Sequence, residues 1–228
     1  MEFFEAVQRR RSIRKYLKEP VPSEVMEKAL EAALLAPNSS NMQTWGFYWV
    51  KTEPKRKTLI EACLNQNAAR TAQELLVVAA IPSLWRKTQK EMMRRIERDK
   101  SPAIVRKYYE SHIPFGYGWQ ILAPLKWLML NLNGLFKPSI RHPWNYRDIQ
   151  EISIKSAALA AENFMLAISA QGFDTCPMEG FDEKRVKKLV GLGFTSRIVM
   201  VVSVGKRDEK GVWGPQVRFD RDWFVHSI

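Results

Sequence analysis

The chain has 228 residues, of which 46% are hydrophobic and 26% are charged; this composition excludes a disordered or collagen-like chain and fits a single domain, residues 1–228. Its 36 Lys and Arg against 24 Asp and Glu give a net charge of +12, so phosphate, nucleic acid and membrane surfaces all qualify as anionic partners. Two cysteines, Cys63 and Cys176, exclude a disulfide framework, and the charged N-terminus lacks the pattern of a secretion signal, which together predict a cytoplasmic protein.

The spacing of hydrophobic residues and the positions of proline predict alternating helices and strands before residue 82. A short amphipathic helix begins at Phe3 and leads into the basic run of residues 9–16. A second helix, with Ser23 as its capping residue, ends before Pro37. A strand, a helix and a second strand are then predicted over residues 45–50, 54–67 and 75–81. This alternation favours an α/β or α+β sheet covered by helices.

Residues 83–145 differ in character from the rest of the chain and are treated as an insertion. The stretch 86–107 holds nine basic residues and three acidic ones. Its excess of six positive charges is half of the net charge of the chain. Residues 113–140 then contain no acidic residue and are rich in leucine and aromatic side chains. Their longest apolar run is interrupted by Pro124 and Lys126 and is shorter than the roughly 20 residues that span a bilayer, so we expect no transmembrane helix.

Regular patterning resumes near Arg147 with a long helix that reaches Gln171. Its apolar residues occupy nearly every face, which predicts a buried central helix. The elements predicted to follow are a strand over residues 173–176, a tight turn over residues 177–182, a helix capped by Asp182 and a final strand over residues 197–205.

The first segment that could carry chemistry contains Arg10, Arg11, Ser12 and Arg14. Three guanidinium groups and a hydroxyl lie within five residues, and the nearest acids are too few to pair with all of them. A phosphate would satisfy these groups, because a guanidinium matches phosphate oxygens in bidentate geometry. A solvated basic turn or a general polyanion patch explains the same run equally well when it is considered alone.

Three further segments offer contacts to a ligand. The polar loop of residues 37–45 presents neutral amides and hydroxyls, which suit a heterocycle with carbonyls and ring nitrogens, although a plain capping loop is the alternative. In the turn of residues 177–182, Gly180 permits close approach of the backbone to a ligand, and an ordinary turn fits as well. Gln216 and Arg218 follow the last predicted strand, where an arginine could close a phosphate site.

Taken together and in this order, the four segments resemble the motifs of the FMN-dependent nitroreductase family. The matching stretches read RRSIRKY at residues 10–16, PNSSNMQTW at residues 37–45 and EGFD at residues 179–182. The resemblance covers residues 1–82 and 146–220, which leaves the insertion outside it. It implies an α+β fold with a central, mostly antiparallel sheet flanked by helices. It also implies a homodimer that binds FMN at the subunit interface, with the long helix in the dimer core.

The resemblance also implies which residues contact the cofactor. The phosphate and the ribityl chain would be held by Arg10, Ser12 and Arg218. Arg11 and Gln216 would also contact the cofactor, and Gln216 stands where the family often has a basic residue. Arg14 would lie near the N1 and C2-carbonyl edge, where positive charge stabilises the anionic reduced flavin. The polar loop would approach FMN from the partner subunit, or at its pyrimidine edge, through Asn38, Ser39, Asn41 and Gln43.

The turn after the predicted strand 173–176 would face flavin N5 through Pro177, Met178, Glu179 and Gly180. The backbone of the last two is the candidate catalytic position, because a hydrogen bond to N5 can orient the hydride-accepting atom. Either Asn65 or Asn67 would contact the flavin ring, and the register leaves both open.

The implied activity is that of an FMN oxidoreductase with a ping-pong cycle. NADH or NADPH reduces the flavin, leaves, and is replaced by a small aromatic, quinone or nitro-type acceptor. The cofactor carries the reactivity in flavin chemistry, so neither a protein nucleophile nor a metal site is expected. The insertion would form a helical lid whose Tyr117, Trp119 or Trp127 stacks on the acceptor. A competing hypothesis is a peripheral membrane or polyanion-binding flavoprotein that uses the basic, Trp-rich residues 86–140; no nucleic-acid partner is expected.

Overall fold

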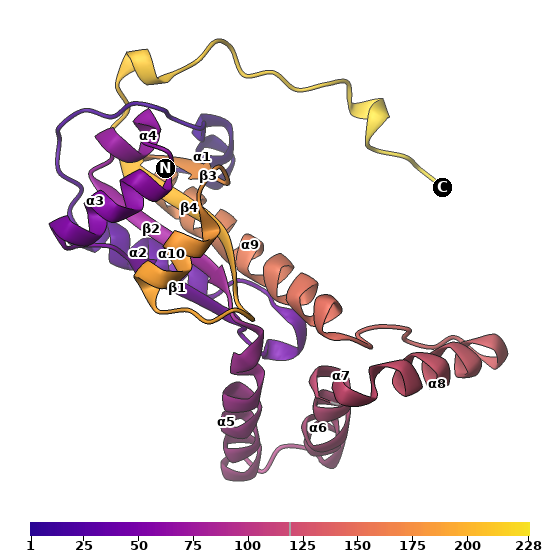
Figure 1. Ribbon diagram of the computed structural model, residues 1–228. Helices are drawn as coiled ribbons and strands as arrows, with labels where there is room; N and C mark the ends of the chain where they lie inside the picture. The colour runs from indigo at the N-terminus through magenta and orange to yellow at the C-terminus, as the bar shows by residue number, and fades with distance from the viewer. Residues whose placement is uncertain (119) are drawn as a thin grey trace.

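The computed structural model describes residues 1–118 and 120–228. At its centre is a sheet whose strands follow the order β1-β2-β4-β3 (Figure 1). The strands are β1 (Trp45–Trp49), β2 (Glu74–Ala80), β3 (Asp174–Met178) and β4 (Arg197–Gly205). Every neighbouring pair of these strands is antiparallel, which confirms the α+β prediction over the α/β alternative. β1 and β3 form the two edges of the sheet.

Helices cover both faces of the sheet. They are α2 (Ser23–Leu34) and α9 (Tyr146–Ala170) on one face, and α3 (Glu53–Ala62) and α10 (Glu183–Val190) on the other. Successive side chains of a strand point to opposite faces, so Leu75 and Val77 join the buried cluster of α3 and α10. Leu76 and Val78 join the cluster of α2 and α9. Burial on both faces explains why nearly every residue of β2 is apolar.

The N-terminal helix α1 (Phe3–Arg9) is held in place by a buried carboxylate. The Arg9 guanidinium donates a hydrogen bond to the carbonyl oxygen of Ser169 at 3.0 Å and pairs with Asp174 at 3.4 Å. Asp174, whose side chain is 2% exposed, also accepts hydrogen bonds from the backbone N–H and the guanidinium of Arg207. These hydrogen bonds raise the pKa of the Arg207 guanidinium. Asp174 therefore joins the start of β3 to α1 and to the segment after β4.

The predicted start of α2 and the predicted end of β3 are wrong. Ser23 is the first helical residue of α2 and Pro22 occupies the capping position, without a side-chain hydrogen bond. Pro177 and Met178 extend β3 instead of opening the turn, because they pair with β4. Asp182 does cap α10, since its carboxylate accepts a hydrogen bond from the backbone N–H of Arg185 at 3.1 Å.

One predicted helix differs from the structure. The helix expected over residues 54–67 ends at Ala62, because Leu64 adopts a left-handed φ of 58°, and a separate short helix, α4 (Asn67–Thr71), follows. The long helix α9 is buried on its sheet side, and Leu159 is 50% exposed on its outer side. Burial of that outer side would require a partner subunit and stays a prediction.

The insertion is helical, as the sequence predicts, and forms a lobe beside the sheet (Figure 1). Its elements are η2 (Pro82–Leu84), α5 (Trp85–Arg98), α6 (Ala103–Lys107), η3 (Tyr108–His112), α7 (Ile113–Tyr117), η4 (Gln120–Leu122) and α8 (Ala123–Phe136). A small buried cluster contains Trp85, Ile96 and Tyr109 of the lobe together with Met42 and Ile149. No helix in the described residues is both long enough and apolar enough to cross a membrane.

A buried lysine attaches α8 to α7. Lys126 is 1% exposed, and its ammonium donates a hydrogen bond to the carbonyl oxygen of Gly116 at 2.8 Å. The ammonium also lies 5.0 Å from the centre of the Phe115 ring. Burial lowers the pKa of Lys126 to about 8, and the carboxylate of Asp148 opposes this effect in part. The charge is therefore easily lost when the pH rises.

Lys126 is expected to make the free energy of unfolding rise with pH between about pH 8 and pH 10.5. In this window the unfolded chain still holds the proton that the folded protein has released, because the ordinary lysine pKa is 10.5. The unfolded state then binds more protons, so stability increases with pH; below this window the burial penalty on the charged form is complete. Urea unfolding on either side of about pH 8 checks this, with Lys126→Met as the control that should lose this contribution. An equal pH slope in both proteins would contradict it.

Candidate functional site

The segment after α1 runs along β3 and places its arginines at the edge of the sheet. Ser12 pairs with Thr175 in a parallel bridge, and the backbone N–H of Ile13 donates to the carbonyl oxygen of Thr175 at 3.0 Å. Ile13 is fully buried, so the alternating direction of extended backbone turns Ser12 and Arg14 to the other side. The sheet thus positions this basic segment, which is no longer a freely solvated turn.

The C-terminal segment completes a small cavity around these arginines. Arg11 donates to the carbonyl oxygen of Gly214 at 2.8 Å, and the Arg14 guanidinium lies 4.5 Å from the centre of the Trp213 ring. The cavity measures about 180 Å³. We call it the arginine pocket; it is lined by Arg10, Arg11, Ser12, Arg14, Pro215, Gln216, Val217 and Arg218. It thus brings together six residues that the sequence assigns to contacts with the cofactor.

The arginine pocket has a strongly positive environment. No acidic residue is among the described residues that line it. The nearest ion pair is a long one, 3.9 Å between Arg10 and the half-exposed Glu162. Burial raises the pKa of the Cys176 thiol, whereas the charges of Arg14 and Arg10 and a hydrogen bond from Ser12 lower it, so these groups also face β3. An anion is the ligand that this arrangement favours.

The turn that follows β3 is exposed at the end of the strand with which the arginine segment pairs. Glu179 and Gly180 are both exposed. The side-chain amide of Gln66 donates to the carbonyl oxygen of Gly180 at 2.6 Å, which fixes the turn. Gln66 is not among the residues predicted from the sequence, which were the neighbouring asparagines, although the run of three amide residues at 65–67 signals it. Both neighbours, Asn65 and Asn67, are exposed, and the structure leaves the choice between them open.

The predicted polar loop, residues 38–44, forms a compact network of amides. The Asn38 side chain accepts a hydrogen bond from the backbone N–H of Gln43 at 2.8 Å, and the Gln43 amide donates to Asn41 at 3.1 Å. Ser40, Asn41 and Gln43 have left-handed φ values of 54°, 52° and 46°. Non-glycine residues in this region are uncommon, and such backbone often marks a binding site. Ser39 lies in the short helix η1 (Ser39–Asn41) and is exposed.

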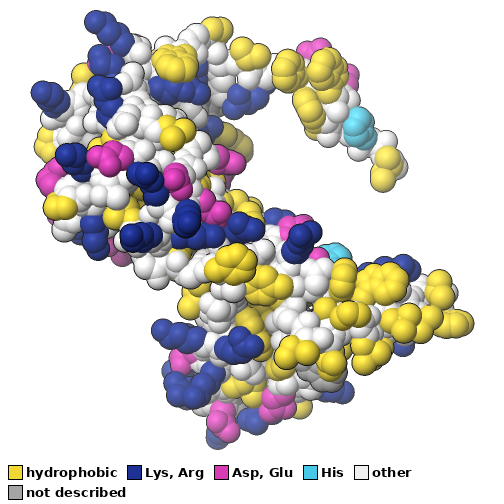
Figure 2. All heavy atoms as spheres, viewed as in Figure 1, with side chains coloured by type: hydrophobic (Ala, Val, Ile, Leu, Met, Phe, Trp, Pro, Cys, Tyr) yellow, Lys and Arg dark blue, Asp and Glu magenta, His cyan; other side chains and the backbone are white. Residues whose placement is uncertain are grey.

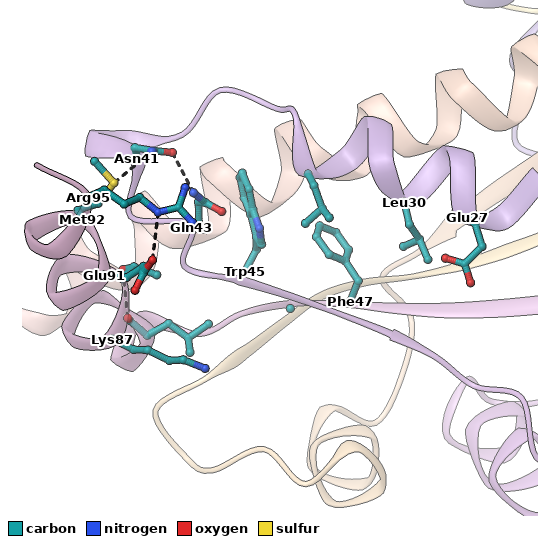
Figure 3. Close-up of a pocket in the computed structure, with 14 residues that line it drawn as sticks. Glu27, Leu30, Asn41, Gln43, Trp45, Phe47, Lys87, Glu91, Met92 and Arg95 are labelled. Carbon is teal, nitrogen blue, oxygen red and sulfur yellow. Dashed lines mark hydrogen bonds and ion pairs between the residues drawn. The ribbon is translucent and has the colours of Figure 1, made fainter. Parts of the chain in front are cut away.

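An apolar groove continues from this loop along β1. Figure 3 shows Trp45 and Phe47 rising from β1 toward Leu30 of α2, with the amides of Asn41 and Gln43 at one end. The groove measures about 750 Å³, and side chains of α5 form its other wall. This groove is not among the sites predicted from the sequence. The sequence signal for it is the pair Trp45 and Phe47, which are two residues apart in a strand and therefore point to the same face.

The arginine pocket and the polar loop lie at opposite edges of one sheet. The pocket adjoins β3, and the loop leads directly into β1, with β4 and β2 between them (Figure 1). Strand spacing alone separates the two edges by roughly 15–20 Å when the segment beside β3 is included. A single chain therefore holds two separate half-sites.

The insertion contacts the polar loop and encloses a further pocket beside it. The hydroxyl of Tyr109 donates to the carbonyl oxygen of Ser40 at 3.0 Å. A cavity of about 640 Å³ lies between this loop, α7 and α8, and Tyr117 lines it while remaining 5% exposed. Burial raises the pKa of the Tyr117 hydroxyl. Trp127 is not among the described residues of this cavity; it packs edge-on against Trp144 at 6.5 Å. Trp119 lies outside the described residues.

Known proteins resemble the chain in sequence and in fold. The model of the nitroreductase family matches residues 7–206. Protein DrgA of Synechocystis sp. is 32% identical over 210 residues, which are 92% of this chain and 86% of that protein. A Bacillus subtilis protein named NAD(P)H nitroreductase MhqN is 25% identical over 206 residues, 90% of this chain and 88% of its own. A crystal structure from Exiguobacterium sibiricum, described as a nitroreductase in complex with FMN, has a TM-score of 0.75 at 25% identity and covers 100% of this chain and 98% of that one.

Proposed function

The chain belongs to the nitroreductase family, and from this premise we propose that it is an FMN-dependent oxidoreductase. It passes a hydride from NADH or NADPH through the flavin to a small aromatic, quinone or nitro-type acceptor. The arginine pocket is the observation that carries the proposal, because it gathers guanidinium groups from two distant segments around one small cavity. The FMN named in the Exiguobacterium sibiricum structure supports the choice of cofactor.

The described residues fit the parts of FMN in charge and in polarity. The arginine pocket, with about 180 Å³ of space, accommodates a phosphate group and supplies charge-assisted hydrogen bonds. Beyond it, the exposed backbone of Glu179 and Gly180 offers a donor and acceptors at the end of β3. The amides of Asn41 and Gln43 offer both donors and acceptors to a ring edge with carbonyls and ring nitrogens.

The roles of the side chains follow from this assignment. When bound, FMN supplies the atom that accepts a hydride from the nicotinamide and returns it to the acceptor. Arg14, held against the Trp213 ring, would place positive charge beside the pyrimidine edge of bound FMN and stabilise its reduced form. The backbone at Gly180, whose carbonyl oxygen accepts a hydrogen bond from Gln66, would offer its N–H to the cofactor. Nicotinamide and acceptor would use the same site in turn.

The two half-sites call for a homodimer in which each flavin site uses both chains. A two-fold axis would place the polar loop of one chain against the arginine pocket of the other, and the same contact would occur twice. The outer side of α9, with Leu159 half exposed, and the apolar groove along β1 supply surface that a second copy would cover. This reading favours the partner subunit as the source of Asn38, Ser39, Asn41 and Gln43.

The pocket beside Tyr117 is the proposed site of the distal part of the acceptor. It adjoins the polar loop through Ser39 and Ser40, and its walls from α7 and α8 are largely apolar. An apolar cavity with a few hydroxyl and imidazole groups suits an aromatic or quinone-like molecule. The lid role of the insertion stays a prediction.

A steady-state screen of the purified protein tests the proposed function. NADH and NADPH are each combined with a panel of quinones, nitroaromatics and halogenated phenols, and the flavin spectrum is recorded on the same sample. We expect a yellow protein that oxidises a reduced nicotinamide only when an acceptor is present. A protein that stays colourless after incubation with excess FMN, and that oxidises neither nicotinamide, would contradict the proposal.

A further inference from the structure

The helix α8 exposes apolar side chains that nothing in the described chain covers. Figure 2 shows hydrophobic side chains gathered over this arm of the molecule. Leu128, Leu132 and Leu135 recur at helical spacing and are 46%, 50% and 72% exposed. Phe136 is 87% exposed at the end of the same helix. Soluble proteins rarely leave a large apolar patch exposed unless a partner covers it, so we infer that a partner covers the exposed side of α8.

The side of α8 that faces the body of the protein is already used. Lys126 is buried against α7, and Leu130 and Asn133 line the pocket beside Tyr117. The exposed leucines lie on the remaining surface of the helix. They are therefore available to an external surface while α8 keeps its contacts with the lobe.

The segment that contains α8 carries a net positive charge. The chain contains no acidic residue between Glu110 and Asp148. Arg141 folds back onto the helix, where its guanidinium donates to the carbonyl oxygen of Gly134 at 3.0 Å. A Cβ at position 134 would meet that guanidinium at 2.9 Å, so glycine leaves the space in which the arginine lies. Lys137 is exposed one residue beyond the helix.

We propose that α8, with Lys137 and Arg141, docks on the surface of an anionic phospholipid bilayer. The apolar side chains enter the boundary between headgroups and acyl chains, and the two cations meet lipid phosphates. Trp127, which is 47% exposed, suits the headgroup depth at which tryptophan is enriched. The helix has 14 residues and is about 21 Å long, shorter than the roughly 30 Å hydrocarbon core, so it lies in the interface plane.

Charge favours the bilayer over a second copy of the chain as the occupant. Two copies that met face to face through α8 would bring Lys137 and Arg141 of both chains together, and the segment of residues 111–147 that carries them has no acidic residue of its own. Like charges at an interface oppose association, whereas anionic lipid headgroups neutralise the same residues. The lipid surface thus satisfies both the apolar and the cationic part of this arm.

Docking also indicates the class of acceptor, an extension that rests on the proposed function. The pocket beside Tyr117 shares α8 with the docking surface, so a molecule dissolved in the bilayer would have a short route to it. We infer that the acceptor is a lipid-soluble quinone. The nicotinamide gives a hydride and the medium gives a proton, and together they reduce the quinone to the quinol.

Vesicle flotation tests the docking without reference to catalysis. The purified full-length protein is mixed with vesicles of neutral phosphatidylcholine, or with vesicles that also contain an anionic phospholipid, at low and high salt. We expect flotation with the anionic vesicles, weakened by salt because it depends in part on charge. The variant L135S/F136S should bind at least about tenfold more weakly, since each side chain loses a burial that contributes to partition. The matched control L35S/F194S changes a leucine and a phenylalanine that are 83% and 93% exposed elsewhere, and should float like the unchanged protein.

Three results would overturn the docking. They are a failure to float with anionic vesicles at low salt, equal flotation of L135S/F136S and the unchanged protein, and a concentration-dependent association in solution that L135S/F136S abolishes. The last result would assign α8 to a second copy.

A paired assay separates this inference from the proposed function. Turnover is measured with a short water-soluble quinone and with a long-chain quinone dissolved in anionic vesicles. L135S/F136S should keep the first activity and lose at least about tenfold of the second. Equal effects on both quinones would contradict the bilayer route. Absence of both activities in the unchanged protein would refute the proposed function, while flotation would still decide the docking.

Discussion

Replacing Arg10 and Arg14 together by alanine is expected to leave a folded protein that no longer retains flavin. Each charge-assisted hydrogen bond to a phosphate or ring oxygen contributes about 1.5–3 kcal/mol, so losing two weakens FMN binding by about a hundredfold or more. The cost to folding is small, because Arg10 makes only a 3.9 Å ion pair and Arg14 stacks on the exposed Trp213 ring. Flavin absorbance per protein and fluorescence titration with FMN measure the loss.

A matched variant distinguishes the effect of losing the pocket arginines from the effect of lowering the net charge. R94A/R98A removes two exposed arginines of α5, whose side chains are 68% and 71% exposed, and changes the net charge by the same amount. It should bind FMN like the unchanged protein. Full flavin content in R10A/R14A, or an equal loss in both variants, would show that the arginine pocket is not the phosphate site.

Replacing Asp174 by alanine is expected to lower the free energy of unfolding by about 3–5 kcal/mol, because it leaves two partly buried guanidinium groups without their shared carboxylate. Arg9 and Arg207, which are 24% and 26% exposed, both pair with it. The substitution also removes the contact that holds α1 against the start of β3, and the arginine segment follows directly after α1. Chemical denaturation measures the change, and flavin content should fall in parallel.

The control for Asp174 is an exposed carboxylate in a helical ion pair. Glu110 pairs with Arg106 at 3.5 Å in the insertion, away from the outer side of α9, and the two side chains are 47% and 43% exposed. Such pairs contribute little, so Glu110→Ala should unfold almost like the unchanged protein. If Asp174→Ala and Glu110→Ala had equal effects, the buried carboxylate would not have the joining role assigned to it.

Hydrophobic spacing and capping residues predict those helices and strands whose formation depends on residues close together in the sequence. The apolar run of β2 and the capping residue Asp182, which begins α10, both appear where the sequence places them. The helix expected over residues 54–67 failed because single left-handed residues interrupt it, and the hydrophobic spacing carries no sign of them. Periodicity records the apolar outer side of α9 but not what covers it, so its burial by a partner subunit stays a prediction.

Local motifs name the residues of the candidate site, whereas their division between two edges of the sheet entered the prediction only through the family resemblance. The motifs identified the arginine segment and the polar loop, yet their separation depends on the strand order β1-β2-β4-β3, which is set by pairings between residues far apart in the chain. Gln66 and Trp213 were missed for the same reason, since each acts through a distant partner, Gly180 and Arg14 respectively.

A subunit-mixing experiment tests most directly whether each flavin site uses both chains. One variant carries R10A/R14A and the other carries N41A/Q43A, with different affinity tags, and the mixed dimer is isolated after coexpression. Each homodimer should be nearly colourless. In the mixed dimer one site combines the intact arginine pocket of the second variant with the intact polar loop of the first, so about half of the normal flavin content and activity should return. If the mixed dimer stays as colourless as its parents, each site is built within one chain and the account is wrong.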